Sequence, residues 1–222
     1  MNIDKIQFNH IAIEEIKRVY ENFKKEIEEK LKEFRELGKN GSKMEIFKEL
    51  AFCLLTPQSR ATICWKVVEN MINNDTLFNG DAKELLKSLQ GVRFKYKKSY
   101  YLVSAREKFF NEGNPIYYYI KNNEDPYKLR DYIIKNIKGL GYKEASHFLR
   151  NIGLGSELAI LDRHILKNLR KLGIIDELTK GFNEKTYKEI EKKIKEFSKD
   201  IKIPMDHLDL TLWAKETGEV FK

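Results

Sequence analysis

Apolar residues recur every three to four positions along almost the whole chain, which is the spacing of an amphipathic helix. No convincing run of alternating apolar and polar residues indicates a strand. The sequence therefore predicts an all-α fold. The expected helices span about 11–37, 43–55, 59–73, 81–89, 96–111, 114–122, 126–137, 143–151, 162–172, 184–199 and 205–216.

Local signals support several of these helix ends. Ser42 and Glu45 have the spacing of a capping box at the start of a helix that reaches about Leu55. Gly38 is expected to end the first helix, and Pro57 to break the chain after the second. No low-complexity or Gly/Ser linker marks a domain boundary.

Composition restricts the class of protein. The chain has 222 residues, 41% of them hydrophobic, so it is long enough to form one or two real cores. The net charge of +8 is compatible with a polyanionic partner but does not identify one. The only cysteines, Cys53 and Cys64, lie in apolar helical patterns and are expected to be buried free thiols of a cytoplasmic protein. The start of the chain lacks an apolar signal region, and no stretch is apolar enough to span a membrane.

The segment IKGLGYKEASHFLR at 137–150 carries the most information. Gly139 and Gly141 form a tight turn between two helical patterns, where backbone N–H groups can approach a phosphate. Lys143 begins the second helix, and Asp162 follows 19 positions later (162 − 143). His147 and Arg150 lie one and two turns after Lys143 and are expected to share its face and to contact DNA. Metal-ligand spacing around the histidines is absent, so no metal site is predicted.

A lysine beside a phosphate-binding turn suggests chemistry on a deoxyribose carbon. A neutral amine can attack C1′ of a nucleotide, displace the base and form a Schiff base that permits β-elimination. Asp162 is expected to cap the following helix and also to stabilise positive charge at C1′ as the base leaves. By residue type alone, each is more commonly a solvated lysine or a simple helix cap.

With GLGYKEA and LDRH, the chain resembles the helix-hairpin-helix DNA glycosylases, whose bifunctional members carry a lysine 19 residues before the catalytic aspartate. The resemblance implies the all-α HhH-GPD fold, base flipping, glycosylase activity and AP-lyase activity. Within this superfamily the chain looks most like the compact second class of 8-oxoguanine DNA glycosylase/AP lyases. It lacks the C-terminal cysteines of endonuclease III and leaves no room for an N-terminal β-rich domain.

The same resemblance implies how the lesion is recognised. Trp213 and Phe94 are expected to stack on opposite faces of the flipped base, and Asp209 to hold the purine edge. The C-terminal Lys222 is expected to help distinguish 8-oxoguanine from guanine. Gln58 lies where such enzymes fill the hole left by the extruded base, although its LTPQS context is closer to endonuclease III. The run Lys95–Lys98 has either a phosphate-contacting or a merely solvated role.

We therefore expect a monomer that binds duplex DNA containing an oxidised base, without a required cofactor; the hairpin backbone of this motif often holds a monovalent cation. The expected lobes are residues 43–140, and 1–42 with 141–222, with the motif at 126–151 beside the cleft. Three alternatives remain: an endonuclease III-like enzyme for oxidised pyrimidines, a non-catalytic DNA-binding module and an unrelated helical interaction domain.

Overall fold

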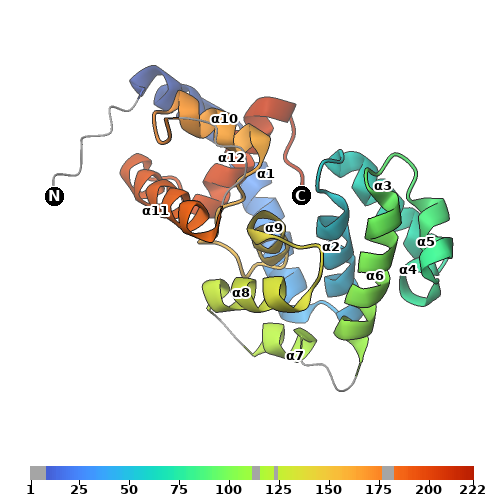
Figure 1. The fold of residues 1–222 in the computed structure, drawn as a ribbon. Coiled ribbons are helices and arrows are strands. Elements are labelled where there is room, and N and C mark those ends of the chain that lie inside the picture. Colours follow the sequence, from blue (N-terminus) through green and yellow to red (C-terminus); the bar gives the residue numbers. More distant parts are fainter. Residues whose placement is uncertain (1–8, 112–115, 123–124, 177–182) are drawn as a thin grey trace. The chain divides into compact units, whose positions relative to one another are not determined.

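The structure, a computed structural model, describes residues 9–111, 116–122, 125–176 and 183–222. Within these residues the regular structure is entirely helical, as predicted (Figure 1). The helices are α1 (His10–Asn40), α2 (Lys43–Leu55), α3 (Ala61–Asn73), α4 (Thr76–Asn79), α5 (Ala82–Ser88), α6 (Lys95–Phe110), α7 (Ile116–Lys121), α8 (Pro126–Asn136), α9 (Tyr142–Asn151), α10 (Arg163–Lys171), α11 (Glu184–Ile201) and α12 (Met205–Thr217).

The chain divides into two compact units, and the division differs from the predicted one. The first unit comprises residues 1–34 and 156–222, and the second comprises 35–155. The segments 35–42 and 141–155 therefore belong with the second unit. The reason is that α9 packs against both α8 and α2, so the glycine turn lies inside one unit instead of at a boundary.

The second unit is built around α2. From Ile46 to Leu55 every residue of this helix except Lys48 is buried, as expected for a helix surrounded by others. Helices α3, α6 and α9 pack against α2 (Figure 1), and α5 packs against α6. Ser42 and Glu45 form the predicted capping box, since each side chain accepts from the other's backbone N–H.

The first unit contains α10, α11, α12 and most of α1. Helix α12 packs against α10 and α11, and its residues Leu208, Leu210 and Leu212 are buried. Helix α11 is amphipathic and buries Tyr187, Ile190, Ile194 and Phe197.

Two local predictions were wrong. Helix α1 does not end at Gly38 but continues to Asn40. Gly38 instead permits a close approach, because a Cβ added there would lie 1.8 Å from the carbonyl oxygen of Ile152. The single-turn helix α4, which follows Asp75 in a left-handed conformation, was not predicted. It is too short to give a periodic signal.

Candidate functional site

The glycine turn forms a hairpin between α8 and α9. Gly139 has a φ of +97°, a conformation that favours glycine, and a Cβ added there would lie 2.4 Å from Cδ2 of Tyr101 on α6. Leu140 is buried, whereas Gly139 and Gly141 are exposed. The N–H of Gly141 donates to the Glu144 carboxylate at 3.3 Å. The turn is thus anchored by one apolar side chain and presents glycine backbone to the surface.

Buried polar contacts fix the two hairpin helices. The guanidinium of Arg130 on α8 is fully buried, donates to the Ser146 hydroxyl on α9 at 3.1 Å and lies 4.9 Å from the ring centroid of Tyr142. The Asn151 side-chain amide at the end of α9 donates to the Glu49 carboxylate on α2 at 2.9 Å. Because a buried polar group is costly without a partner, these contacts restrict α9 to one orientation.

Lys143 lies in the first turn of α9 and is half-buried. Its positive charge acts on groups from three neighbouring helices of the same unit. It favours ionisation of the thiols of Cys53 on α2 and Cys64 on α3, and it opposes protonation of Lys98 on α6. Its ammonium therefore lies within electrostatic reach of a cluster of buried groups.

His147 and Arg150 lie deeper in the fold than expected. Each is only 5% exposed, and the His147 ring packs edge-on against Phe52 on α2 at 5.5 Å. The helical spacing correctly predicted that both residues follow Lys143 along α9. Their side chains, however, are packed inside the unit and are not at its surface. Their contact with DNA stays a prediction that this geometry does not favour.

Asp162 caps α10, as expected from its position. Its backbone is extended, and its Oδ1 accepts from the N–H of Ile165 at 2.8 Å. The preceding residues are held by α11: the Glu191 carboxylate accepts from the N–H of Ala159 at 2.8 Å, and the Tyr187 hydroxyl donates to the carbonyl of Ala159 at 2.6 Å. This buried pair fixes the segment that carries the catalytic candidate.

Trp213 on α12 lies beside α10, the helix that Asp162 caps. The ring of His164, two residues after Asp162, is edge-on to the indole with centroids 5.7 Å apart. Glu216, one turn beyond Trp213, accepts from Lys167 at 2.7 Å and from Asn168 at 3.1 Å. The hydrogen bond from Lys167 is the main cause that lowers the pKa of Glu216. Contacts between α10 and α12 therefore bring the aspartate and the tryptophan into one local arrangement.

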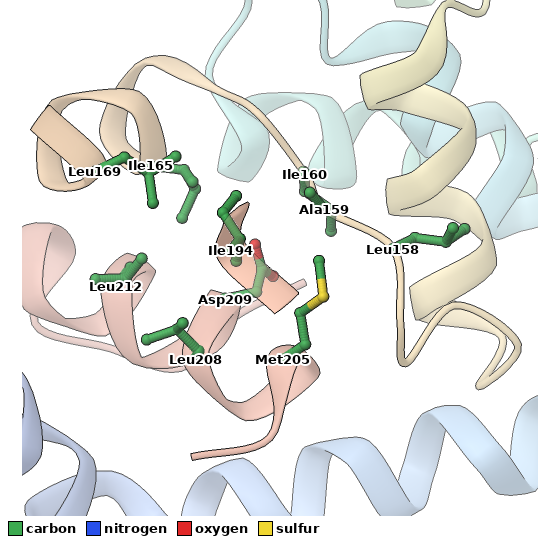
Figure 2. Close-up of a pocket in the computed structure, with 10 residues that line it drawn as sticks. All are labelled: Leu158, Ala159, Ile160, Ile165, Leu169, Ile194, Met205, Leu208, Asp209 and Leu212. Atoms are coloured by element: carbon green, nitrogen blue, oxygen red, sulfur yellow. The ribbon is translucent and has the colours of Figure 1, made fainter. Parts of the chain in front are cut away.

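Asp209 and Lys222 are the other two base-binding candidates of this unit. Asp209 and nine apolar or small residues line a pocket between α10, α11, α12 and the segment leading to Asp162 (Figure 2). Asp209 is the only charged residue among those that line it. Lys222 is partly buried in the segment after α12.

Gln58 and Phe94 belong to the other unit and share an unusual backbone. Their φ angles are +55° and +59°, in the left-handed region that non-glycine residues rarely adopt. Gln58 is exposed, Phe94 is 52% exposed, and the guanidinium of Arg93 lies 5.6 Å from the Phe94 ring centroid. Both side chains are therefore available at the surface of this unit.

Lys98 is the residue whose role the sequence did not reveal. It was expected on a phosphate-contacting or solvated face, yet it is only 3% exposed. Desolvation lowers its pKa to about 8, and the cations Lys143 and Arg93 act in the same direction, against Cys64 and Glu144. The lysine-rich run gave no signal that one member is directed inward.

The cysteines are buried, as predicted. Desolvation raises the pKa of Cys53 well above its ordinary value and that of Cys64 to about 11. In the described part of the chain no group of three or more His, Cys, Asp or Glu residues could hold a metal ion. No described helix is long and apolar enough to cross a membrane.

Comparisons with known proteins agree with this architecture. The all-helical fold is that of the helix-hairpin-helix DNA glycosylases. Residues 27–203 match the sequence model of the 8-oxoguanine DNA glycosylase domain, and the chain belongs to this family.

Two sequence matches and one structural match illustrate the similarity. An 8-oxoguanine DNA glycosylase/AP lyase of Fusobacterium nucleatum is 48% identical over 209 residues, covering 94% of this chain and 96% of the relative. The enzyme of that name from Methanocaldococcus jannaschii is 38% identical over 211 residues, covering 95% and 97%. The structure of the M. jannaschii 8-oxoguanine glycosylase/lyase with a 15mer DNA containing 8-oxoguanine has a TM-score of 0.86 and 34% identity, and covers 96% of this chain and 100% of the other.

Proposed function

We propose that this protein removes 8-oxoguanine from duplex DNA and then cleaves the strand at the abasic site. The observation that carries the proposal is the placement of Lys143 in the first turn of α9, directly after an exposed glycine hairpin. Membership of the 8-oxoguanine DNA glycosylase family supports the same activity. The relative solved with DNA containing 8-oxoguanine supports the substrate.

The hairpin holds the DNA strand in this proposal. Gly139 and Gly141 leave the backbone accessible, so amide N–H groups of the turn bind a phosphate oxygen without reading the base. In this proposal the N–H of Gly141 exchanges the Glu144 carboxylate for the phosphate. The exposed backbone is also compatible with a monovalent cation bridging the turn to the phosphate. No other cofactor is required for the chemistry below.

Lys143 supplies the nucleophile. Its neutral amine attacks C1′ and forms a C–N bond, while the bond to the base breaks and the base leaves with that electron pair and gains a proton. Opening of the sugar ring gives a protonated Schiff base. Loss of a proton from C2′ then expels the 3′ phosphate by β-elimination, and water later releases Lys143.

Asp162 acts on the same carbon in this proposal. Its carboxylate stabilises the positive charge that develops at C1′ as the base leaves, and it accepts the proton that Lys143 loses. The cap to Ile165 uses Oδ1 and leaves the second carboxylate oxygen for that role.

Four further residues recognise the extruded base in this proposal. We assign the two stacking faces to Trp213 and Phe94, the purine edge to Asp209 and discrimination from guanine to Lys222. Stacking is worth about 1–3 kcal/mol per base and offsets the loss of stacking in the duplex. Gln58 fills the vacated position in the helix.

Borohydride reduction tests the proposed intermediate. An 8-oxoguanine duplex should give a covalent enzyme–DNA adduct with the native protein but none with Lys143→Gln. Lys25→Gln is the control, because the Lys25 side chain is 91% exposed and lies far along the sequence. An adduct that persists in Lys143→Gln would reject this lysine as the nucleophile.

One alternative substrate has a specific observation in its favour, the Thr56–Ser59 sequence that is closer to endonuclease III. Competition between 8-oxoguanine and thymine-glycol duplexes decides between the two. Faster adduct formation on thymine glycol, unaffected by removal of Lys222, would assign the enzyme to oxidised pyrimidines. We further propose that the protein is a monomer and that it is located in the cytoplasm, where it binds duplex DNA.

A further inference from the structure

A buried lysine connects the two surface loops that carry Gln58 and Phe94. Lys98 lies in the first turn of α6, and its ammonium has three donors. It donates to the carbonyl of Leu55 at 2.7 Å, to the carbonyl of Pro57 at 2.8 Å and to the Ser59 hydroxyl at 3.3 Å. One side chain thus satisfies three acceptors, one at the end of α2 and two in the loop that follows it.

These acceptors explain why a cation is placed there. Leu55 is the last residue of α2, and the final carbonyls of a helix lack intrahelical partners and carry partial negative charge. Pro57 directly precedes Gln58, the residue in the left-handed conformation. Lys98 therefore stabilises a helix end and restrains the residue next to the strained position.

Ser59 extends the connection to the second loop. Its hydroxyl oxygen also accepts from the backbone N–H of Arg93 at 3.0 Å. Arg93 precedes Phe94, another exposed residue with a positive φ. Strained backbone persists only where surrounding contacts determine it. Here the hydrogen-bonded pair of buried Lys98 and partly buried Ser59 lies between two such residues.

We propose that Lys98 is a positioning residue that holds Gln58 and Phe94 in fixed register for lesion extrusion. This inference rests on the proposed function. Gln58 must enter the duplex where the base has left, and Phe94 must meet the same base after extrusion. Their relative placement is therefore productive only if the two loops move as one body, which the shared hydrogen bonds to Lys98 and Ser59 provide.

The test separates base extrusion from the chemistry of Lys143. Excision from an 8-oxoguanine duplex requires extrusion, whereas cleavage of a preformed abasic-site duplex has no base to place against Phe94. Lys98→Met keeps the length of the side chain and removes its donors. Lys98→Arg keeps the cation, and Lys66→Met replaces an exposed lysine on α3 of the same unit.

Single-turnover excision should fall about 100-fold in Lys98→Met, because small misplacements of binding groups cost rates of this order. Abasic-site cleavage and duplex affinity should change less than about threefold, and Lys98→Arg should recover at least about tenfold of the lost excision. Lys66→Met should match the native enzyme. Ser59→Ala removes the shared acceptor and the long 3.4 Å hydrogen bond from Ser59 to the Pro57 carbonyl, but it keeps Lys98. It therefore provides a milder variant, with about a tenfold loss, should Lys98→Met fold poorly.

Equal losses of excision and abasic-site cleavage in both the Lys98 and Ser59 variants would overturn the inference, as would unchanged excision. Absence of 8-oxoguanine excision by the native protein would instead reject the proposed function. The two failures are thus distinguishable in one set of assays.

Discussion

Oδ1 of Asp162 accepts a hydrogen bond from the backbone N–H of Ile165 at 2.8 Å, so the proposed catalytic carboxylate is also the N-cap of α10. The two roles make different demands on the side chain. A cap needs an oxygen acceptor, which Asn or Ser also supplies, whereas charge stabilisation at C1′ needs a carboxylate.

Substitutions at Asp162 should therefore separate stability from activity. Asp162→Asn and Asp162→Ser should keep the unfolding free energy within a few tenths of a kcal/mol, while Asp162→Ala should lower it by about 1 kcal/mol. All three should reduce single-turnover excision by about 100-fold or more. Urea unfolding and quenched excision assays measure the two effects, and near-native excision by Asp162→Asn would restrict the residue to capping.

The two hairpin glycines should respond differently to alanine. Gly139→Ala introduces a side chain at φ +97° and places its Cβ 2.4 Å from the Tyr101 ring, so it should destabilise the protein by roughly 2 kcal/mol and weaken duplex binding. Gly141 has a negative φ, and its nearest neighbour would be the Glu144 carboxylate at 3.3 Å, so Gly141→Ala should cost much less. Thermal unfolding and binding to an uncleavable abasic-analogue duplex compare the pair. Equal effects would show that the turn does not depend on its left-handed residue.

The contacts of Glu216 should contribute stability that disappears in acid. Because the hydrogen bond from Lys167 lowers its pKa below 4.5, this contribution is present in full above that pH and is lost as pH falls through the lowered value. Glu216→Gln should therefore be about 1 kcal/mol less stable than the native protein near neutral pH, and this difference should shrink as the pH falls through the lowered pKa. Glu219→Gln, an exposed neighbour, is the control. A difference that persists in acid would assign the loss to packing instead of charge.

Lys98 should make stability rise with pH in mildly alkaline solution. Its pKa is about 8 in the folded protein and 10.5 ordinarily, so between these values the unfolded chain binds more protons and folding is favoured by raising the pH. Cys64, whose pKa is raised from 9.0 to about 11, acts in the opposite direction at higher pH. The comparison therefore belongs between about pH 7 and pH 9, where the native protein should gain about 1 kcal/mol relative to Lys98→Met. If the unfolding free energies of the two proteins depended on pH in the same way, a buried, titrating amine at Lys98 would be contradicted.

Periodicity and capping signals predicted the helices because these features are local. The Ser42–Glu45 box and the Asp162 cap are both in place, and the cysteines in apolar patterns are buried. The family could be recognised from the glycine turn and the spacing of Lys143 and Asp162, because these residues lie close together in the sequence and form a short motif.

Features set by tertiary packing could not be predicted in the same way. In the sequence nothing distinguishes Lys98 from the other lysines of its run. Its burial depends on hydrogen bonds to the carbonyls of residues 55 and 57, which only the folded chain places beside it. His147 and Arg150 have the right helical phase but are buried in the packed unit, where α9 meets α2 and α8. The unit boundary at 155/156 likewise depends on which helices pack together.

Helix α6 contacts the hairpin through Tyr101 and begins directly after Phe94, seven residues earlier (101 − 94). Seven residues are about two helical turns, or roughly 10 Å of axial rise. The helix therefore sets the distance between the hairpin proposed to hold the DNA strand and Phe94, the ring proposed to stack on the base. Inserting one residue there would rotate Phe94 by about 100° around the axis, so the proposed stacking tolerates an exchange of side chains along α6 better than a change in the length of this segment.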